Sequence, residues 1–478
     1  VGVAITAGKL GIGFTDNNIK VGSTALDSLT TGTKNVAVGD AALTANTTGE
    51  GNTAVGHNVL DANTTGTGNA AVGDRALTAN TTGNQNTAMG QFALNANTTA
   101  ASNTAIGYNA LLSNTTGTNN VALGAYSLDA NTTASHNTAI GTNALTLNTT
   151  GASNVSVGRG SLGNNSTASN NTAVGDMALN ANTTGNNHAV VGATAGDANT
   201  TGVNLTAIGF NAAGANTTGD NNTAVGKDAL ASSTTATNLV AIGAFALKQN
   251  TGSDNTAVGL SALELNTTGI RNTAVGTQAL DAVTTTNDNT ALGYQALTAS
   301  TTGQNNTAVG RNALGASQSG SNNVAVGRLA MAGANVTADN NVALGYQALY
   351  ANIGGAGNIA LGTNALVVNT TGGNNVALGM NALDANTTGN YNTAIGGQAL
   401  TESTTASENV AIGYQCMDSA TTANNCVAVG MKAMDDLTTG VGNIAIGRYA
   451  LGDITDGTGC TAIGAYDGGA QPALRNNT

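Results

Sequence analysis

Apolar and polar residues follow a 17-residue phrase that recurs along nearly the whole chain. In one clean copy, residues 52–56 read Asn-Thr-Ala-Val-Gly, Leu60 follows, and residues 63–66 read Asn-Thr-Thr-Gly. The glycine that ends the first half recurs 27 times, from Gly22 to Gly464. Self-similarity at a fixed period indicates a repeat protein in which each copy is one structural unit.

The changes of repeat length fall in one part of the phrase. The copy from Gly243 to Gly259 has lost a single residue and the copy from Gly327 to Gly345 has gained one, and both changes lie after the leucine position. Insertions and deletions are tolerated where the backbone is solvated. We therefore expect the Asn-Thr-Thr-Gly stretch to be a solvated turn.

The residues before each glycine predict a short β-strand. The residue directly before it is Val, Ile, Leu or Met in all 27 copies, and the residue three before it is Thr, Val, Ile or Ala. Such residues at alternating sites favour a strand with one apolar face.

The opposite face of this strand is equally restricted. It carries Ala two residues before the glycine in every copy except at Lys20, Ser156 and Val190, and Asn four residues before it in 22 of 27 copies. Leucine and cysteine are among the replacements of this asparagine, which indicates a dry site, so both strand faces are expected to be buried. The replacements are His188, Leu205, Leu239, Cys426 and Cys460.

Buried asparagines on successive repeats can bond to one another, which satisfies their amides without water. We predict such a structural ladder for Asn52, Asn86, Asn103, Asn120, Asn171, Asn222, Asn272 and Asn306. We predict an apolar stack for Val55, Leu60, Val72, Leu77, Ile106, Leu111, Val174 and Leu179.

These patterns predict an all-β fold, a parallel β-solenoid (β-roll) of about 27 rungs in which each 17-residue repeat forms one coil. At a strand spacing of about 4.8 Å, this would give a rod roughly 130 Å long. A coil this small covers only one strand face, so we expect the second layer to come from another copy of the chain. A parallel homo-oligomer follows, with a homotrimer as the leading case.

The two ends depart from the phrase. Residues 1–17 are expected to form an N-terminal cap or joining segment, residues 18–464 the repeats, and residues 465–478 a C-terminal cap or tail. A solenoid must cover its terminal rungs or pair them, so such segments either cap the stack or join units end to end.

Composition narrows the class of protein. The chain of 478 residues has 66 Gly, one Pro, no Trp and only 8% charged residues, unlike a conventional globular enzyme or a typical disordered chain. A net charge of −12 argues against a nucleic-acid partner. No stretch is long and apolar enough to predict a membrane span.

The residues that could carry chemistry are scattered. His57, His136 and His188 occupy different repeat positions many rungs apart, and carboxylates such as Asp61 and Asp129 occupy variable slots that we expect to face water. A glycan-cleaving enzyme would need a pair of carboxylates, usually on an inserted loop, and no insertion in these repeats is longer than one residue. We therefore predict no catalytic, cofactor-binding or metal-binding residues, no cofactor and no enzymatic activity.

The Asn-Thr-Thr corner allows two interpretations. Residues 63–65 fit the Asn-X-Thr pattern, which predicts a ladder of glycans if the chain is exported and glycosylated. The simpler interpretation is that Asn and Thr cap a tight corner, and we prefer it because it needs no modifying enzyme.

One irregularity indicates packing within the coil. The leucine position holds Gly196 and Ala213, and nearby ladder positions hold the bulkier His188 and Leu205. We expect the larger residues to fill the volume that the missing leucines leave, because cavities lower stability.

The phrase resembles a known family. Asn-Thr-Ala-Val-Gly at 52–56, 171–175 and 272–276 resembles the Ser-Val-Ala-Ile-Gly type of repeat in the heads of trimeric autotransporter adhesins, and closely resembles repeats in phage and cyanophage tail-fibre proteins. The resemblance covers residues 18–464 and implies a left-handed, trimeric β-roll that projects from a cell or virion. The adhesin repeat is shorter, so we expect a different coil shape.

Three classes of function stay open. We favour a non-enzymatic structural fibre, extracellular and on a cell surface or virion, with a role in attachment to a cell-surface or glycan receptor. A self-assembling extracellular filament of end-to-end units is the second. A surface-binding solenoid or enzyme, including a glycan-binding or ice-binding solenoid, is the third.

Overall fold

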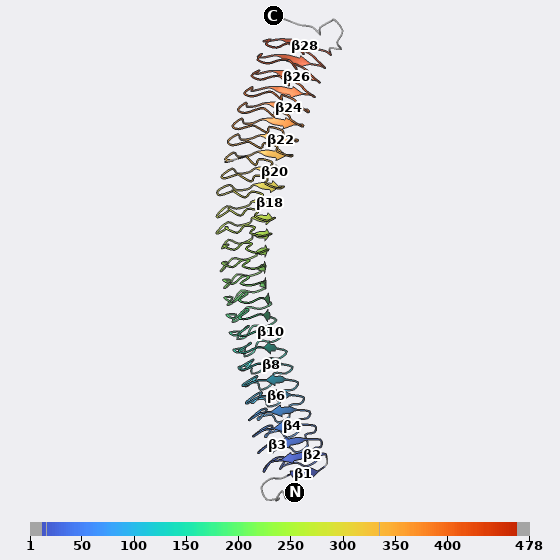
Figure 1. Ribbon diagram of the computed structural model, residues 1–478, viewed down its shortest axis with the longest axis vertical. Helices are drawn as coiled ribbons and strands as arrows, with labels where there is room; N and C mark the ends of the chain where they lie inside the picture. Colours follow the sequence, from blue (N-terminus) through green and yellow to red (C-terminus); the bar gives the residue numbers. More distant parts are fainter. Residues whose placement is uncertain (1–11, 16, 334, 466–478) are drawn as a thin grey trace, which may run out of the picture. The chain divides into compact units, whose positions relative to one another are not determined.

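The computed structural model describes residues 12–15, 17–333 and 335–465. The chain divides into two compact units, residues 1–238 and 239–478. Within the described residues each unit consists of short strands and turns without any helix. Each unit is a parallel β-solenoid with a 17-residue repeat, one strand per coil (Figure 1), which confirms the predicted fold class.

The first unit stacks its strands in chain order. From β2 to β14 each strand pairs in parallel with the next, whereas β1 runs antiparallel to β2. β1 thus reverses direction within the segment predicted as an N-terminal cap or joint; residues 1–11 lie outside the described residues. The strands are β1 (Ile12–Thr15), β2 (Asn18–Val21), β3 (Val36–Val38), β4 (Thr53–Val55), β5 (Ala70–Val72), β6 (Thr87–Met89), β7 (Thr104–Ile106), β8 (Val121–Leu123), β9 (Thr138–Ile140), β10 (Val155–Val157), β11 (Thr172–Val174), β12 (Ala189–Val191), β13 (Thr206–Ile208) and β14 (Thr223–Val225).

The second unit repeats this arrangement with parallel pairs throughout its described strands. Residues 466–478, which make up nearly all of the predicted C-terminal tail, lie outside the described residues. The strands are β15 (Val240–Ile242), β16 (Thr256–Val258), β17 (Thr273–Val275), β18 (Thr290–Leu292), β19 (Thr307–Val309), β20 (Val324–Val326), β21 (Val342–Leu344), β22 (Ile359–Leu361), β23 (Val376–Leu378), β24 (Thr393–Ile395), β25 (Val410–Ile412), β26 (Val427–Val429), β27 (Ile444–Ile446) and β28 (Thr461–Ile463).

Equivalent repeat positions pair across neighbouring rungs. Where a repeat has lost a residue, Val240 still pairs with Thr256, and where a repeat has gained one, Val324 still pairs with Val342. The corner absorbs the change of length, because a slip of one residue would turn every strand side chain to the wrong face.

The repeat is numbered below from its asparagine, so that Asn52 is position 1 and Gly56 position 5. Gly56 has φ of 136°, and a Cβ there would lie 2.8 Å from the carbonyl oxygen of Gly73 in the next rung. Only glycine adopts this conformation without strain and permits this approach, which explains its presence in every copy.

Leucine at position 9 lies in an unusual backbone conformation. Leu60 has φ of 52°, in the left-handed region, and its side chain is fully buried. The left-handed conformation costs roughly 1–2 kcal/mol for a residue with a Cβ. Burying a leucine side chain contributes about 1.5–3 kcal/mol, which offsets that cost.

The interior of the coil is narrow. Alanines at positions 3 and 8, such as Ala71 and Ala76, are fully buried. In the rung of β10 both positions are serine, and the Oγ atoms of Ser156 and Ser161 lie 2.5 Å apart. Positions 3 and 8 therefore face each other across the coil. Most rungs carry alanine at both, which fits a narrow interior, and the larger Val59 and Val190 are fully buried as well.

Candidate functional site

The asparagines at position 1 form a buried ladder between side chains and backbone. The Oδ1 of Asn103 accepts a hydrogen bond from the backbone N–H of Asn120 in the next rung (2.9 Å), and its Nδ2 donates to the Gly117 carbonyl of its own rung (2.9 Å). Each amide therefore links two rungs and closes one coil. All eight predicted ladder residues are buried: Asn52, Asn86, Asn103, Asn120, Asn171, Asn222, Asn272 and Asn306.

A second asparagine ladder lies at the corner that was predicted to be a solvated turn. The corner does bend there, but Asn63 is fully buried, and its Nδ2 donates to Asn46 Oδ1 (2.8 Å) and to the Gly66 carbonyl (3.1 Å). The same carbonyl accepts Asn52 Nδ2 (2.8 Å), so the two ladders meet at one atom. The predicted turn is present, but the corner is only partly solvated, because its asparagine points into the coil.

This burial bears on glycosylation of the Asn-Thr-Thr corner. The nitrogen that a glycan would occupy on Asn63 is engaged in two hydrogen bonds inside the coil. Thr64 is half-buried, and its Oγ1 donates to the Thr81 carbonyl (3.1 Å), whereas Thr65 is exposed. The folded corner therefore offers threonine rather than asparagine to the solvent.

The predicted apolar stack separates into two sets. Leu60, Leu77, Leu111 and Leu179 are fully buried in the coil, whereas Val55, Val72, Ile106 and Val174 lie on the outward strand face and are half-exposed. A single chain therefore covers only one strand face, as expected for so small a coil, and the covering of the second face by another copy stays a prediction. The physical reason is size, because a 17-residue coil has room for only the alanine and asparagine face.

The outward strand face is apolar in both units. Position 4 carries Val, Ile, Leu or Met in every rung, and position 2 carries Thr, Val, Ile or Ala. Many of the large apolar side chains on this face keep 36–47% of their surface accessible to solvent, which is high for residues of this type. They include Met89, Leu123, Ile140, Val191 and Ile208 in the first unit and Ile242, Leu292, Leu344, Leu361, Leu378, Ile412 and Ile446 in the second.

The rungs that lack leucine are packed in a different way. A Cβ on Gly196 would lie 3.0 Å from Leu205 Cδ2 and 3.7 Å from Val190 Cγ2. Leu205 and Val190 are both fully buried, and Val190 replaces the alanine usual at position 3. These side chains thus occupy the space beside Gly196, in agreement with the prediction that larger residues fill the volume of the missing leucine.

His188 replaces a ladder asparagine in this irregular region. Its Nδ1 accepts a hydrogen bond from Leu205 N–H (3.1 Å), as an asparagine oxygen does elsewhere. Burial lowers the pKa of His188 from 6.5 to about 4, more than the Gly202 carbonyl and Asp220 raise it. The ring is therefore neutral at pH 7 and acts as a structural acceptor.

Asp61 and Asp129 do not form an acid pair with each other. Asp61 and Asp129, which were expected to face water, are half-buried at position 10, and burial raises the pKa of both. They lie four rungs apart, about 19 Å by strand spacing. Within the described residues, no group of three His, Cys, Asp or Glu is placed to hold a metal ion.

The cysteines are free thiols. Cys416 and Cys426 are buried and Cys460 is partly exposed. Burial raises the pKa of Cys416 to about 12 and also raises that of Cys426, which disfavours the reactive thiolate.

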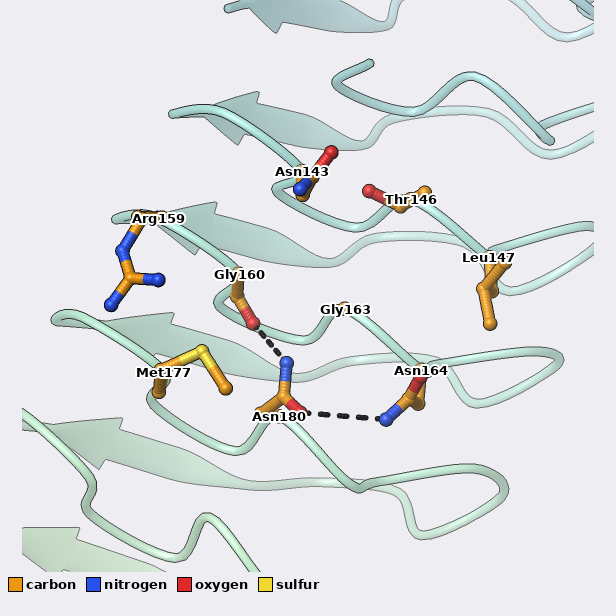
Figure 2. A pocket seen from close by; sticks show the side chains of 9 residues that line it. All are labelled: Asn143, Thr146, Leu147, Arg159, Gly160, Gly163, Asn164, Met177 and Asn180. Atoms are coloured by element: carbon orange, nitrogen blue, oxygen red, sulfur yellow. Dashed lines mark hydrogen bonds between the residues drawn. The ribbon is translucent and has the colours of Figure 1, made fainter. Parts of the chain in front are cut away.

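A surface depression of about 410 Å³ lies on the first unit where a rung has two glycines, Gly160 at position 7 and Gly163 at position 10. Figure 2 shows Asn180 reaching back to donate its Nδ2 to the Gly160 carbonyl (2.6 Å), with Asn164 Nδ2 3.4 Å from Asn180 Oδ1. These amides satisfy one another, so the depression by itself indicates no ligand. The other lining residues are Asn143, Thr146, Leu147, Arg159 and Met177.

The corner after the strand carries aromatic residues that the repeat pattern did not predict; Tyr108 and Tyr126 are exposed and Phe92 is half-buried. In the first unit Phe92, Tyr108 and Tyr126 make edge-to-face contacts on successive rungs, with ring centroids 6.5 and 5.3 Å apart. Arg75 lies 5.6 Å from the Phe92 ring centroid. A search for aromatics at positions 6 and 7 would have found them, because these variable positions fall one above another in a solenoid.

Comparison with known proteins does not assign the chain. No family model matches it, and no curated protein matches it. Within the described residues no helix is long and apolar enough to cross a membrane. The resemblance to adhesin heads and tail fibres therefore stays a prediction.

Proposed function

We propose that the protein is a non-enzymatic structural fibre whose chains associate in parallel, most simply as a homotrimer, through their outward strand faces. The fibre projects outside a cell or virion and has a role in attachment. The observation that carries this proposal is the uncovered apolar strand face, which repeats at every rung of each unit.

The chemistry of that face supports association with identical chains. A chain that satisfies its interior amides through two ladders has no internal need for valine, isoleucine or leucine on its outer face. Exposed apolar surfaces of this extent are typical of protein interfaces. Identical chains in parallel offer one another the same spacing of rungs, so their side chains can interdigitate along the whole face.

The mass of the purified chain in solution tests the proposal. By light scattering we expect a mass three times that of the 46.4-kDa chain. Leu123→Lys with Ile140→Lys, at position 4 of adjacent rungs, should yield monomers, because lysines in the interface lose their water. A monomeric wild-type chain would contradict the proposal, and a dimer would contradict only the trimer.

A matched control adds the same two positive charges to the same two rungs, away from the outward strand face. Thr133→Lys with Thr150→Lys places two lysines at exposed corners and should leave the mass unchanged. Electron microscopy separates the alternatives, because rods of fixed length indicate a fibre and indefinite filaments indicate the end-to-end polymer. Hydrolysis of a polysaccharide by the purified chain would contradict the non-enzymatic assignment.

A further inference from the structure

Four exposed side chains form a column on the second unit, at position 6 of consecutive rungs. In order they are Tyr294, Arg311, Arg328 and Tyr346, each directly after the glycine that ends a strand. Backbone hydrogen bonds hold neighbouring rungs together at this corner. They run from Asn312 N–H to the Tyr294 carbonyl (3.0 Å), from Leu329 N–H to the Arg311 carbonyl (3.1 Å) and from Gln347 N–H to the Arg328 carbonyl (3.2 Å).

Each arginine packs on the tyrosine at its own end of the column. Arg311 Cζ lies 5.8 Å from the Tyr294 ring centroid, and Arg328 Cζ lies 5.7 Å from the Tyr346 ring centroid. A guanidinium group at this distance from a ring is attracted to it. The tyrosines therefore attract the two guanidinium groups towards opposite ends of the column.

This pair of charges differs from Arg159 and Arg271, which form ion pairs with aspartates. Arg159, also at position 6, is followed one rung later by Asp176, and their side chains form an ion pair (2.9 Å). Arg311 is followed by a second arginine instead. Within residues 239–333 and 335–465, neither Arg311 nor Arg328 forms an ion pair.

The surroundings of the column also lack negative charge. Residues 289–383 contain one acidic residue, Asp339, although the whole chain has a net charge of −12. Asp339 lies before β21 whereas Tyr346 follows it, so the carboxylate is at the other end of the strand. Its Oδ1 already accepts a hydrogen bond from Ser321 N–H (2.7 Å).

We propose that Arg311 and Arg328 form a binding site for the sulfate or carboxylate groups of an acidic polysaccharide. Guanidinium groups bind oxyanions through paired N–H donors, and an oxyanion between them would remove the repulsion of the two charges. The exposed faces of Tyr294 and Tyr346 offer apolar surface for the adjoining sugar rings. The site deepens the proposed attachment role and depends on that proposal only for its biological purpose.

Binding of labelled polysaccharides to the full chain tests the site. Fluorescence anisotropy with dextran sulfate, hyaluronan and neutral dextran separates sulfate, carboxylate and uncharged sugar as ligands. We expect binding of at least one acidic polymer, no binding of neutral dextran, and an affinity about tenfold or more weaker in Arg311→Gln with Arg328→Gln.

The matched control removes the same charge from ion-paired arginines. Arg159→Gln with Arg271→Gln breaks the pairs with Asp176 and Asp288 and should change the affinity by about twofold or less. Equal losses in both variants, or no binding by the wild type, would overturn the site. Circular dichroism and light scattering of the same samples report fold and oligomeric mass, so a failed fibre proposal is distinguishable from a failed site.

Discussion

Two regions of the first unit fill the same coil in different ways. In the regular rung that starts at Asn103, the buried asparagine side chain bonds to the backbone of the next rung and to that of its own rung, and Leu111 fills the centre. In the rungs that start at His188 and Leu205, the central leucine is replaced by glycine or alanine, and the ladder position carries the bulk instead.

In these two rungs the interior volume is kept although the side-chain ladder is interrupted. Leu205 cannot accept a hydrogen bond through its side chain, yet its Cδ2 occupies the space beside Gly196. An empty site of leucine size would lower stability by several kcal/mol. One missing amide costs less when water or other groups bond its partners.

The largest expected effect is on a regular rung. Asn103→Leu should lower the free energy of unfolding by about 3–5 kcal/mol, because it adds bulk beside Leu111, removes the acceptor of the Asn120 N–H and removes one of the two donors to the Gly117 carbonyl. Denaturation followed by circular dichroism measures the change. Thr99→Leu, at an exposed corner of the preceding rung, should change stability by about 0.5 kcal/mol or less. Similar losses in both variants would mean that the ladder contributes little.

The pH dependence of His188 should be the next largest effect. The folded pKa of about 4 lies below the unfolded value of 6.5, so between these values only the unfolded state binds the proton. Stability should therefore fall as the pH falls from 6.5 to 4, by up to about 3 kcal/mol, and then level off.

Comparison with His188→Asn isolates this contribution, since all other titrating groups are shared. The variant should restore the regular ladder and lose the slope between pH 6.5 and 4. Parallel curves for the two proteins would show that the ring is solvated in the folded state.

The smallest effect tests the exchange of volume directly. Leu205→Asn should destabilise by about 2 kcal/mol, because the cavity outweighs the regained amide. Gly196→Leu alone should also destabilise, since its Cβ would meet Leu205 Cδ2 at 3.0 Å. The double variant should recover at least about 1 kcal/mol relative to the sum of the two changes. If the losses of stability from Leu205→Asn and Gly196→Leu simply add in the double variant, Leu205 does not fill the volume of the leucine that is missing at Gly196.

Much of the fold could be predicted from the periodicity alone. A fixed phrase with alternating β-branched residues allows few structures other than stacked strands. The position of Asn52 and its equivalents is otherwise occupied only by His, Leu and Cys, which indicated that it faces the interior. Gly196 and Leu205 could be linked for the same reason, because residues at equivalent positions of adjacent repeats are neighbours in any solenoid.

The corner asparagines could not be placed in this way. Asn63 stands in a stretch of polar residues with threonine and glycine, a composition typical of a solvated turn. Only the path of the backbone shows that Asn63 turns inward while Thr65 turns outward. The pair of Arg311 and Arg328 was not predicted, because the two residues are one full repeat apart in the chain and occupy a position whose residue type varies between repeats.

The sequence by itself determined the period, the strand, the need for glycine at position 5 and the all-β class, because these depend on local conformation and on repetition. The tertiary structure decided which strand face the chain covers. Val55 and Leu60 are equally apolar, and no local pattern tells them apart. Leu60 points into the coil and Val55 points away from it, because so small a coil has room for only one set of apolar side chains.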